Sequence, residues 1–286
     1  MAVYERVYQR YTGLTTPSWA RILVLPRYAL RDVFRSRLLV FFFALCFVVP
    51  LMAAAVIYAR HNLPLLDTFQ LSVDDLIAVD ARAYYYFLDA QFGLGFFLTL
   101  FVGTGLVSRD LAHNALPLYL ARPISRAEYV TGKLLTLGLL LSAVTWIPGV
   151  LLFLFNGAFE GPGWMVENAR LMIGTVIGST LWLAVLSMLT LALSAWVKWR
   201  PVAAFALFML YVMGSFFAFV TNQLFRTDWG HLVNLDQLVQ IVTAALLGAE
   251  VPDGPPVAVA GLALLVFSAF GLLLLHLKIR AYEVVS

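Results

Sequence analysis

Residues 109–133, RDLAHNALPLYLARPISRAEYVTGK, lie between two long apolar runs of a 286-residue chain. This segment is polar and contains two prolines, Pro117 and Pro123. The chain as a whole is strongly apolar, since 62% of its residues are hydrophobic, 12% are charged and the mean hydropathy is +0.88. A soluble domain carries roughly 25% charged residues. The composition therefore predicts a membrane protein that crosses the bilayer several times.

Six runs are long and apolar enough to cross a hydrocarbon core of roughly 30 Å, which takes about 20 helical residues. They cover residues 38–59, 90–108, 134–159, 171–197, 201–225 and 257–277. Helices are expected in all of them, because an open sheet leaves backbone polar groups unpaired in lipid. The predicted fold is an all-α membrane protein in which residues 38–277 form one domain of six transmembrane helices.

The basic residues predict the orientation of these helices. Fifteen of the 19 Lys and Arg residues precede the first run, follow the second or fourth run, or follow the last run. By the positive-inside rule, residues 1–37, segment 109–133 and tail 278–286 are cytoplasmic, in a multi-pass protein of the plasma (inner) membrane. The pI near 9.0 reflects these loops, and no nucleic-acid partner is expected.

An amphipathic helix is predicted before the first run, with five charged residues: Arg27, Arg31, Asp32, Arg35 and Arg37. The arginines at 27, 31 and 35 share one face, and Pro26 is expected to open the well-formed part of the helix. Such a helix lies in the membrane interface, with its arginines among anionic lipid headgroups. A plain positive anchor for the first run fits the same charges.

Two extracytoplasmic segments, 60–89 and 226–256, carry further features. The first contains five aspartates, which suit a solvated acidic loop, a cation site or a docking surface for an extracytoplasmic protein. In the second, residues 231–248 have helical apolar spacing but are too few to cross, so they form either an interfacial helix or a re-entrant segment. Gly174 and Gly178 in the fourth run form a GxxxG pair that lets helices pack closely.

Catalytic and metal-binding patterns are absent from the sequence. It contains neither an HExxH nor a GxSxG motif, and its one cysteine, Cys46, lies in the first run. The six predicted runs contain no Asp, Glu, Lys or Arg, whereas an ion-coupled carrier places ionisable groups near the midplane. We therefore expect neither an enzyme nor a metal site, and an ion-coupled carrier is the weaker alternative. The energy for any transport is expected from a separate cytoplasmic ATPase.

Segment 109–133 has the pattern of helix, turn and helix. Arg122 precedes a proline, which favours an extended conformation at this position. Ser125 and Glu128 fit a capping box that opens a helix running through Lys133 into the third run. An ordinary loop with capped helices fits this pattern, and so does an element that receives a soluble partner.

These residues resemble the ABC-2-type permeases, the membrane subunits of a class of ABC exporters. Between the second and third spans that family carries a pattern close to Glu-x-x-x-Gly-Thr-Leu, then Pro-x-Ser-Arg and Gly-Lys-Leu. The corresponding residues here are Asp110, Asn114-Ala115-Leu116, Pro123-Ile124-Ser125-Arg126 and Gly132-Lys133-Leu134. Residues 27–37 are similar to the family's interfacial helix. The sequence departs from the pattern at Asp110, at Asn114-Ala115 and at Ala29.

The resemblance implies two permease subunits, identical or related, and two ATPase subunits that bind ATP and Mg²⁺, with no cofactor on this chain. It makes 109–133 the coupling region, with these candidate residues: Arg109, Asp110, Asn114, Leu116, Arg122, Pro123, Ser125 and Arg126. Asp110 and Arg126 are expected to contact the ATPase or the interfacial helix. The expected cargo is lipidic, amphiphilic or glycan-type. The alternative is a mechanotransmission subunit that drives an extracytoplasmic partner docked on 60–89.

Overall fold

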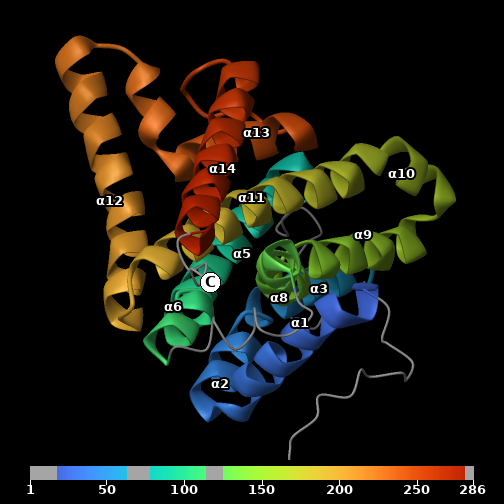
Figure 1. Cartoon of the computed structure of the whole chain (residues 1–286). Helices are drawn as coiled ribbons and strands as arrows, with labels where there is room; N and C mark the ends of the chain where they lie inside the picture. The colour runs from blue at the N-terminus through green and yellow to red at the C-terminus, as the bar shows by residue number, and fades with distance from the viewer. Residues whose placement is uncertain (1–17, 63–77, 114–124, 281–286) are drawn as a thin grey trace, which may run out of the picture.

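The structure, a computed structural model, describes residues 18–62, 78–113 and 125–280. Within these ranges the chain is built of helices and contains no strand (Figure 1). Six helical segments are long and apolar enough to cross a membrane, which confirms the predicted fold class. We number them spans 1 to 6: Arg37–Arg60, Ala81–Ala112, Arg126–Glu160, Ala169–Trp196, Arg200–Phe225 and Val257–Lys278.

Each of the first three spans consists of two helices. Span 1 contains α2 (Arg37–Leu45) and α3 (Val48–Arg60), span 2 contains α5 (Ala81–Val102) and α6 (Gly105–Ala112), and span 3 contains α8 (Arg126–Val144) and α9 (Trp146–Glu160). The short helix α10 (Pro162–Glu167) leads into span 4, which is α11 (Ala169–Trp196). Spans 5 and 6 are α12 (Arg200–Phe225) and α14 (Val257–Arg280).

Prolines account for two of the three breaks, because a proline has no N–H for the carbonyl four residues earlier. Pro148 has none for Val144, where α8 ends. Pro50 has none for Cys46, and the Cys46 carbonyl accepts instead from Nε2 of Gln91 on α5, at 3.2 Å. A neighbouring span thus supplies the hydrogen bond that the break removes, as burial in a membrane requires.

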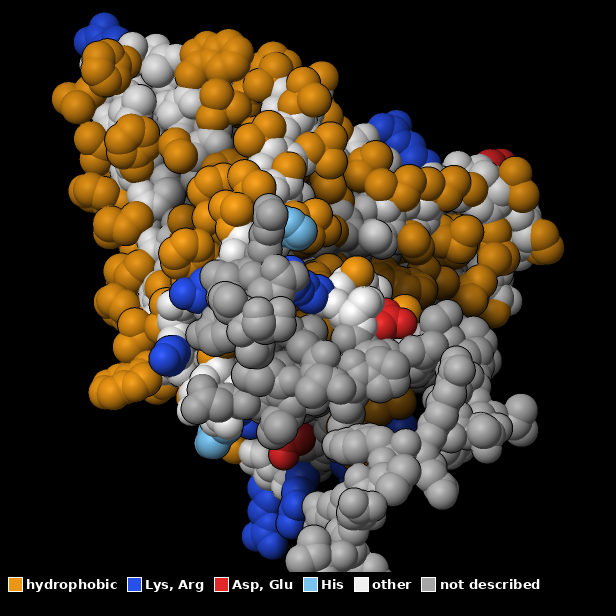
Figure 2. Space-filling model, in the orientation of Figure 1, with side chains coloured by type: hydrophobic (Ala, Val, Ile, Leu, Met, Phe, Trp, Pro, Cys, Tyr) orange, Lys and Arg blue, Asp and Glu red, His pale blue; other side chains and the backbone are white. Residues whose placement is uncertain are grey.

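Spans 2, 3 and 4 form the centre of the bundle. In the most apolar 18-residue stretch of each of these spans, 50% to 61% of the residues are buried, whereas the same share is 17% in spans 1, 5 and 6. Phe92 of α5 stacks on Trp182 of α11 with ring centroids 4.7 Å apart. Figure 2 shows hydrophobic side chains over α12 and the outer surface of the bundle, whereas Lys and Arg gather around α6 and the N-terminal helix α1 (Ser18–Arg35). We call the part of the molecule formed by α1, the beginning of α2, α6 and the beginning of α8 the α1 end.

Helix α1 (Ser18–Arg35) corrects one prediction, because Pro26 lies inside the helix and does not begin it. Pro26 has no N–H for the carbonyl of Ile22. That carbonyl faces Gly132 of α8, where a Cβ atom added to Gly132 would lie 3.3 Å from it and 2.9 Å from Leu25 Cδ1. The missing side chain of Gly132 therefore lets α1 pack directly on α8, and this packing holds a helix that contains a proline.

Beyond α12 the chain doubles back. After Arg226, which has a left-handed backbone, it forms the 3-10 helix η2 (Trp229–Val233) and then α13 (Leu235–Leu247). Ser215 Oγ donates to Oδ1 of Asn234 at 3.2 Å. Ser215 lies ten residues before the end of α12, or about 15 Å along the helix. The helical segment predicted at 231–248 is thus two helices, η2 and α13, and the chain returns along α12.

The two predicted packing glycines lie against α13. A Cβ on Gly174 would be 3.0 Å from the backbone of Leu246, and one on Gly178 would be 3.2 Å from the side chain of Thr243. Arg170 of α11 donates to the carbonyls of Ala245 and Leu246 at the C-terminal end of α13, at 2.6 and 3.1 Å. Close backbone packing and a cationic cap therefore hold α13 on α11.

Candidate functional site

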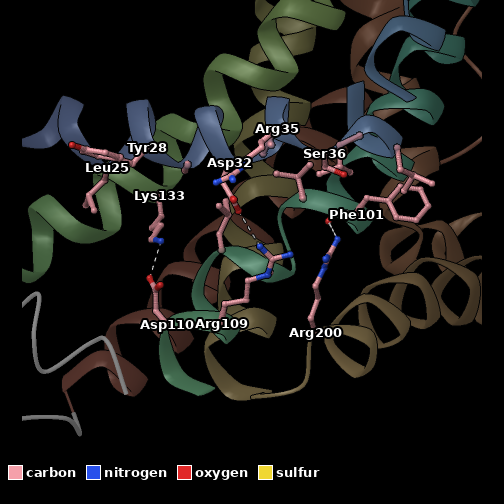
Figure 3. Close-up of a pocket in the computed structure, with 17 residues that line it drawn as sticks. Leu25, Tyr28, Asp32, Arg35, Ser36, Phe101, Arg109, Asp110, Lys133 and Arg200 are labelled. Carbon is pink, nitrogen blue, oxygen red and sulfur yellow. Dashed lines mark hydrogen bonds and ion pairs between the residues drawn. The ribbon is translucent and has the colours of Figure 1, made fainter. Parts of the chain in front are cut away.

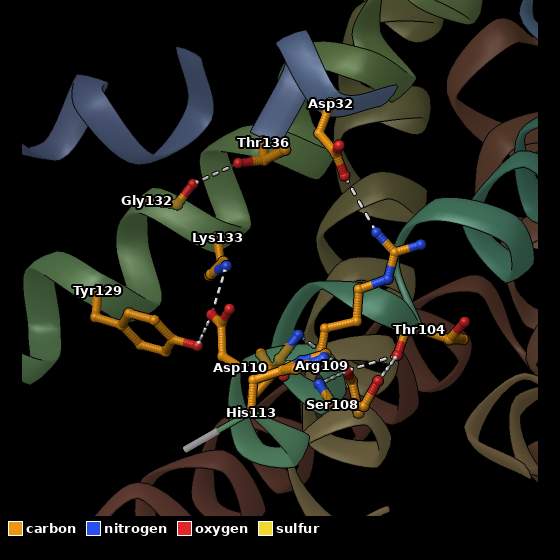
Figure 4. Close-up of polar contacts among 12 residues, drawn as sticks. Asp32, Thr104, Ser108, Arg109, Asp110, His113, Tyr129, Gly132, Lys133 and Thr136 are labelled. Atoms are coloured by element: carbon orange, nitrogen blue, oxygen red, sulfur yellow. Dashed lines mark hydrogen bonds and ion pairs between the residues drawn. The ribbon is translucent and has the colours of Figure 1, made fainter. Parts of the chain in front are cut away.

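The α1 end brings together the end of span 2, the beginning of span 3 and α1. Asp110, on the last turn of α6, is the central residue (Figure 4). Its Oδ2 atom lies 2.8 Å from Lys133 Nζ and accepts a hydrogen bond of 2.8 Å from the Tyr129 hydroxyl. The side chains of Lys133 and Asp110 are only 9% and 15% exposed. We call these three residues the Asp110 cluster.

The spacing of Tyr129 and Lys133 explains how α8 forms its half of this cluster. Residues four apart lie on the same face of a helix, one turn apart. Both side chains therefore point from α8 toward α6, and Lys133 Nζ also lies 5.4 Å from the centre of the Tyr129 ring. A buried charge pair needs further hydrogen bonds to offset its desolvation, and the Tyr129 hydroxyl supplies one to the carboxylate.

The neighbouring residue, Arg109, joins α6 to α1. Its Nη1 atom lies 3.1 Å from Oδ2 of Asp32. These side chains are 51% and 68% exposed, so this pair stabilises the contact far less than the Asp110 cluster does. With Gly132 packed against α1 and Lys133 paired to α6, consecutive residues of α8 connect all three elements.

The break between α5 and α6 in span 2 is stabilised by residues of spans 4 and 5. Ser194 Oγ of α11 accepts from the backbone N–H groups of Val107 and Ser108, at 3.1 and 2.9 Å, and donates to the Thr104 carbonyl at 2.8 Å. Arg200, at the beginning of α12, donates to the Phe101 carbonyl. Helix α6 is therefore tied to span 4 as well as to span 3 and α1, and Arg200 ties span 5 to the end of α5.

The predicted coupling residues divide into two groups. Asn114, Leu116, Arg122 and Pro123 lie outside the described residues. Ser125 caps α8, and its capping box with Glu128 is confirmed by hydrogen bonds of 2.7 and 3.2 Å between them. Arg126 is the first residue of α8 and is half-buried. Arg27, Arg31, Asp32, Arg35 and Arg37 are all exposed, on α1 or at the beginning of α2.

Several site residues have no role in the predictions from sequence. Lys133 enters them only as a loop charge and as part of a motif, Arg200 enters them only as a loop charge, and Tyr129 and Ser194 do not enter them. Tyr129 and Lys133 lie four residues apart after a capping box, and this spacing is a usable sequence signal that they share one face of α8. Ser194 and Arg200 carry no such signal, because their contacts depend on how span 4 packs against a break in span 2.

A second polar group lies toward the other end of the bundle. Gln240 Nε2 of α13 donates to Oδ1 of Asp89 and Oδ2 of Asp236, both at 3.0 Å. Burial, and then the charge of Asp89, raise the pKa of Asp236. Asp89 lies inside α5, which begins at Ala81, so the helix of span 2 begins before the apolar run predicted from residue 90. Hydropathy locates the apolar centre of a helix, whereas Asp80 caps this one nine residues before Asp89 and accepts from the N–H of Ala83 at 2.8 Å.

No group of three or more His, Cys, Asp or Glu side chains that could hold a metal occurs in the described part of the chain. The site at the α1 end is instead a set of internal ion pairs and hydrogen bonds. Such a set can hold helices together and pass a displacement between them.

One comparison with known proteins identifies the family. The model of the ABC-2 family transporter proteins matches residues 27–274, a range that contains the second half of α1, the whole Asp110 cluster and all six spans except the end of α14. No curated protein matches the chain. The family consists of membrane subunits that work with ABC ATPase subunits, and the match confirms the resemblance found in segment 109–133. The chain belongs to the ABC-2 family of transporter proteins.

Proposed function

We propose that this permease is part of an ATP-driven exporter in the plasma (inner) membrane, with its α1 end and both termini in the cytoplasm. The Lys and Arg residues around α1 and α6 support this orientation, because positive loops stay on the cytoplasmic side. Two permeases and two ATPases form the complex, and the ATPases bind ATP and Mg²⁺. This chain binds no cofactor in the proposal and catalyses no reaction.

The Asp110 cluster is the observation that carries the proposal. Residues 114–124 connect α6 to α8, and the two helices meet again at the 2.8 Å contact between Asp110 and Lys133. The Arg109–Asp32 pair and Gly132 add α1 to the same unit. A force on segment 114–124 therefore reaches span 2, span 3 and α1 together, which suits a coupling element that passes ATPase closure to the membrane helices.

This geometry changes the role that we assign to Asp110. Its carboxylate is used within the chain, so it acts as a positioning residue and not as an ATPase contact. We assign the ATPase contacts to segment 114–124, with Asn114, Leu116 and Arg122 as the candidate residues. The contact with the interfacial helix is made by Arg109.

The test uses the permease assembled with its ATPase in nanodiscs. The variants Asp110→Lys and Lys133→Asp each place two like charges in one buried site, so each is expected to abolish the effect of the permease on ATP hydrolysis. The double variant restores an opposite pair and is expected to recover part of that effect. Lys198→Glu is the matched control, because Lys198 is exposed and lies outside the Asp110 cluster and α1. Co-purification of the ATPase separates lost coupling from lost assembly, and normal coupling in both single variants would refute the proposal.

The cargo is proposed to be lipidic, amphiphilic or glycan-type, and to move where two permeases meet along α12. Figure 1 shows α12 standing apart from the other spans. It exposes a series of large apolar side chains: Phe205, Phe216, Phe217, Phe219, Leu224 and Phe225. A second copy on this surface would bury them and leave an apolar passage between the subunits.

Cysteine cross-linking tests this pairing, because Cys46 is fully buried and gives little background. Phe216→Cys on α12 is expected to form a disulfide-linked dimer in membranes under mild oxidation. Val266→Cys on α14, which is similarly exposed, is the control and is expected to stay monomeric. Cross-linking at Val266 alone would place the partner on span 6 instead.

Mechanotransmission is the second candidate, favoured by the aspartates at positions 67, 74 and 75 between spans 1 and 2. The structure sharpens its test. Deletion of residues 65–76 leaves Asp80, the cap of α5, in place. A mechanotransmission subunit is expected to lose its extracytoplasmic partner in this variant while ATPase coupling persists, whereas an exporter is expected to keep its transport.

A further inference from the structure

A cavity of about 520 Å³ lies at the α1 end, between α1 and the beginning of α2 on one side and α6 on the other (Figure 3). Its charged lining residues are four cations and two carboxylates: Arg35, Arg109, Lys133, Arg200, Asp32 and Asp110. Lys133 and Asp110 neutralise each other. The remaining three arginines share one carboxylate, that of Asp32, so the cavity has an excess of positive charge.

Two of these arginines converge on one point. A Cβ atom on Gly105 would lie 3.4 Å from Nε of Arg109 and 3.4 Å from Nε of Arg200. The two guanidinium groups are thus neighbours, and like charges this close repel each other. Arg200 donates to the Phe101 carbonyl, a neutral acceptor, and Asp32 is 68% exposed. An added anion between the two arginines would relieve the repulsion.

The chemistry of the lining indicates which anion fits. Guanidinium groups bind phosphate oxygens through paired N–H donors, and a site with two arginines suits a phosphate group well. The rim of the cavity is apolar, since Leu38 and Phe101 line it and are 66% and 39% exposed. Leu38 belongs to the first turn of α2 and so connects the cavity with the lipid-facing surface of span 1.

We propose that this cavity binds the phosphate head of an anionic membrane phospholipid. The phosphate lies between Arg109 and Arg200, and the acyl chains leave past Leu38 and Phe101 into the surrounding leaflet. A lipid accounts for the apolar rim, which a free phosphate ion does not use. Because Arg109 is on α6 and Arg200 is on α12, the bound lipid links the coupling unit to span 5. The proposed lipid site rests on the geometry of this cavity and on the location of the protein in a membrane. It does not depend on the proposed direction of transport.

The test measures lipid binding to the purified full-length chain in detergent, by native mass spectrometry. The probes are dioleoyl phosphatidylglycerol, which is anionic, and dioleoyl phosphatidylcholine, which is zwitterionic. We expect the anionic lipid to bind about tenfold more tightly, because both lipids offer a phosphate but the choline cation of the zwitterionic lipid is repelled by the excess positive charge of the cavity. Arg109→Gln and Arg200→Gln are each expected to lower its affinity about tenfold, and Arg200→Lys by less.

Two further variants make the result specific. Lys198→Gln removes one positive charge two residues from Arg200, at an exposed position outside the cavity, and is expected to leave the affinity unchanged. Arg35→Gln changes a cavity arginine that has no ion-pair partner in the described part of the chain, so it preserves the fold while lowering the affinity. Unchanged affinity in Arg35→Gln and Arg200→Gln, or an equal loss in Lys198→Gln, would overturn the proposal. Displacement of the lipid by inorganic phosphate at equal concentration would overturn its lipid part.

Discussion

Replacement of Lys133 by methionine is expected to destabilise the bundle strongly, because it leaves the Asp110 carboxylate buried without a cation. The two side chains are 9% and 15% exposed and 2.8 Å apart. Removal of one partner from a buried pair costs about 3–5 kcal/mol. The hydrogen bond from Tyr129 to the same carboxylate remains, so we expect a loss at the lower end, about 3 kcal/mol.

A double-mutant cycle separates the ion pair from the loss of packing. Asp110→Asn together with Lys133→Met leaves no orphan charge, and the amide oxygen introduced at position 110 is still able to accept from Tyr129. We therefore expect the double variant to lose only about 1 kcal/mol, which gives a coupling energy of about 2 kcal/mol or more between the two sites.

The assay is equilibrium unfolding in mixed detergent micelles, followed by tryptophan fluorescence. Lys278→Met is the matched control, since Lys278 lies 5.0 Å from the centre of the Trp196 ring and forms no carboxylate pair among the described residues. Its loss is expected to stay below about 1 kcal/mol, the range of an exposed cation–π contact. Additive losses at 110 and 133, or a Lys133→Met loss no larger than that of the control, would refute the reasoning.

Three further predictions concern the contacts around the cluster and the second polar group. Gly132→Ala is expected to cost about 1–3 kcal/mol in the same unfolding assay, since its Cβ would press on Leu25 of α1 at 2.9 Å. Ser194→Ala leaves two buried N–H groups in α6 without their acceptor and is expected to cost about 3 kcal/mol, whereas Ser194→Thr keeps the hydroxyl and loses less. Asp236→Asn is expected to raise the melting temperature at pH values above the raised pKa of Asp236 and to flatten the pH dependence of the melting temperature. A melting temperature independent of pH in the wild type would contradict this. The raised pKa of Asp236 means that its contribution to stability is present at low pH and is lost as the pH rises through that pKa.

The sequence is sufficient to predict features that depend on neighbours along the chain. The six spans follow from runs of apolar residues, and the capping box of Ser125 and Glu128 follows from a spacing of three. The sequence alone does not predict contacts between helices. Asp110 and Lys133 are 23 positions apart, and nothing in their spacing shows that α6 and α8 lie side by side. Local propensity favours Pro26 at a helix start, whereas the packing of α1 on Gly132 places it inside the helix.

The breaks in spans 1 to 3 have a consequence for how a displacement travels. At the break in span 2, a Cβ on Gly103 would lie 2.8 Å from Cγ2 of Thr190, so α5 and α11 are in close contact at the junction. Beyond that junction, Ser194 holds the first turn of α6 and the Asp110 cluster holds its last turn. Helix α6 is thus bonded more extensively to α1, α8 and α11 than to α5, the helix that precedes it. A movement of segment 114–124 is therefore expected to carry α6 as one unit with these neighbours and to bend span 2 at residues 103–104, where regular helical hydrogen bonds are replaced by contacts with Ser194 and Arg200.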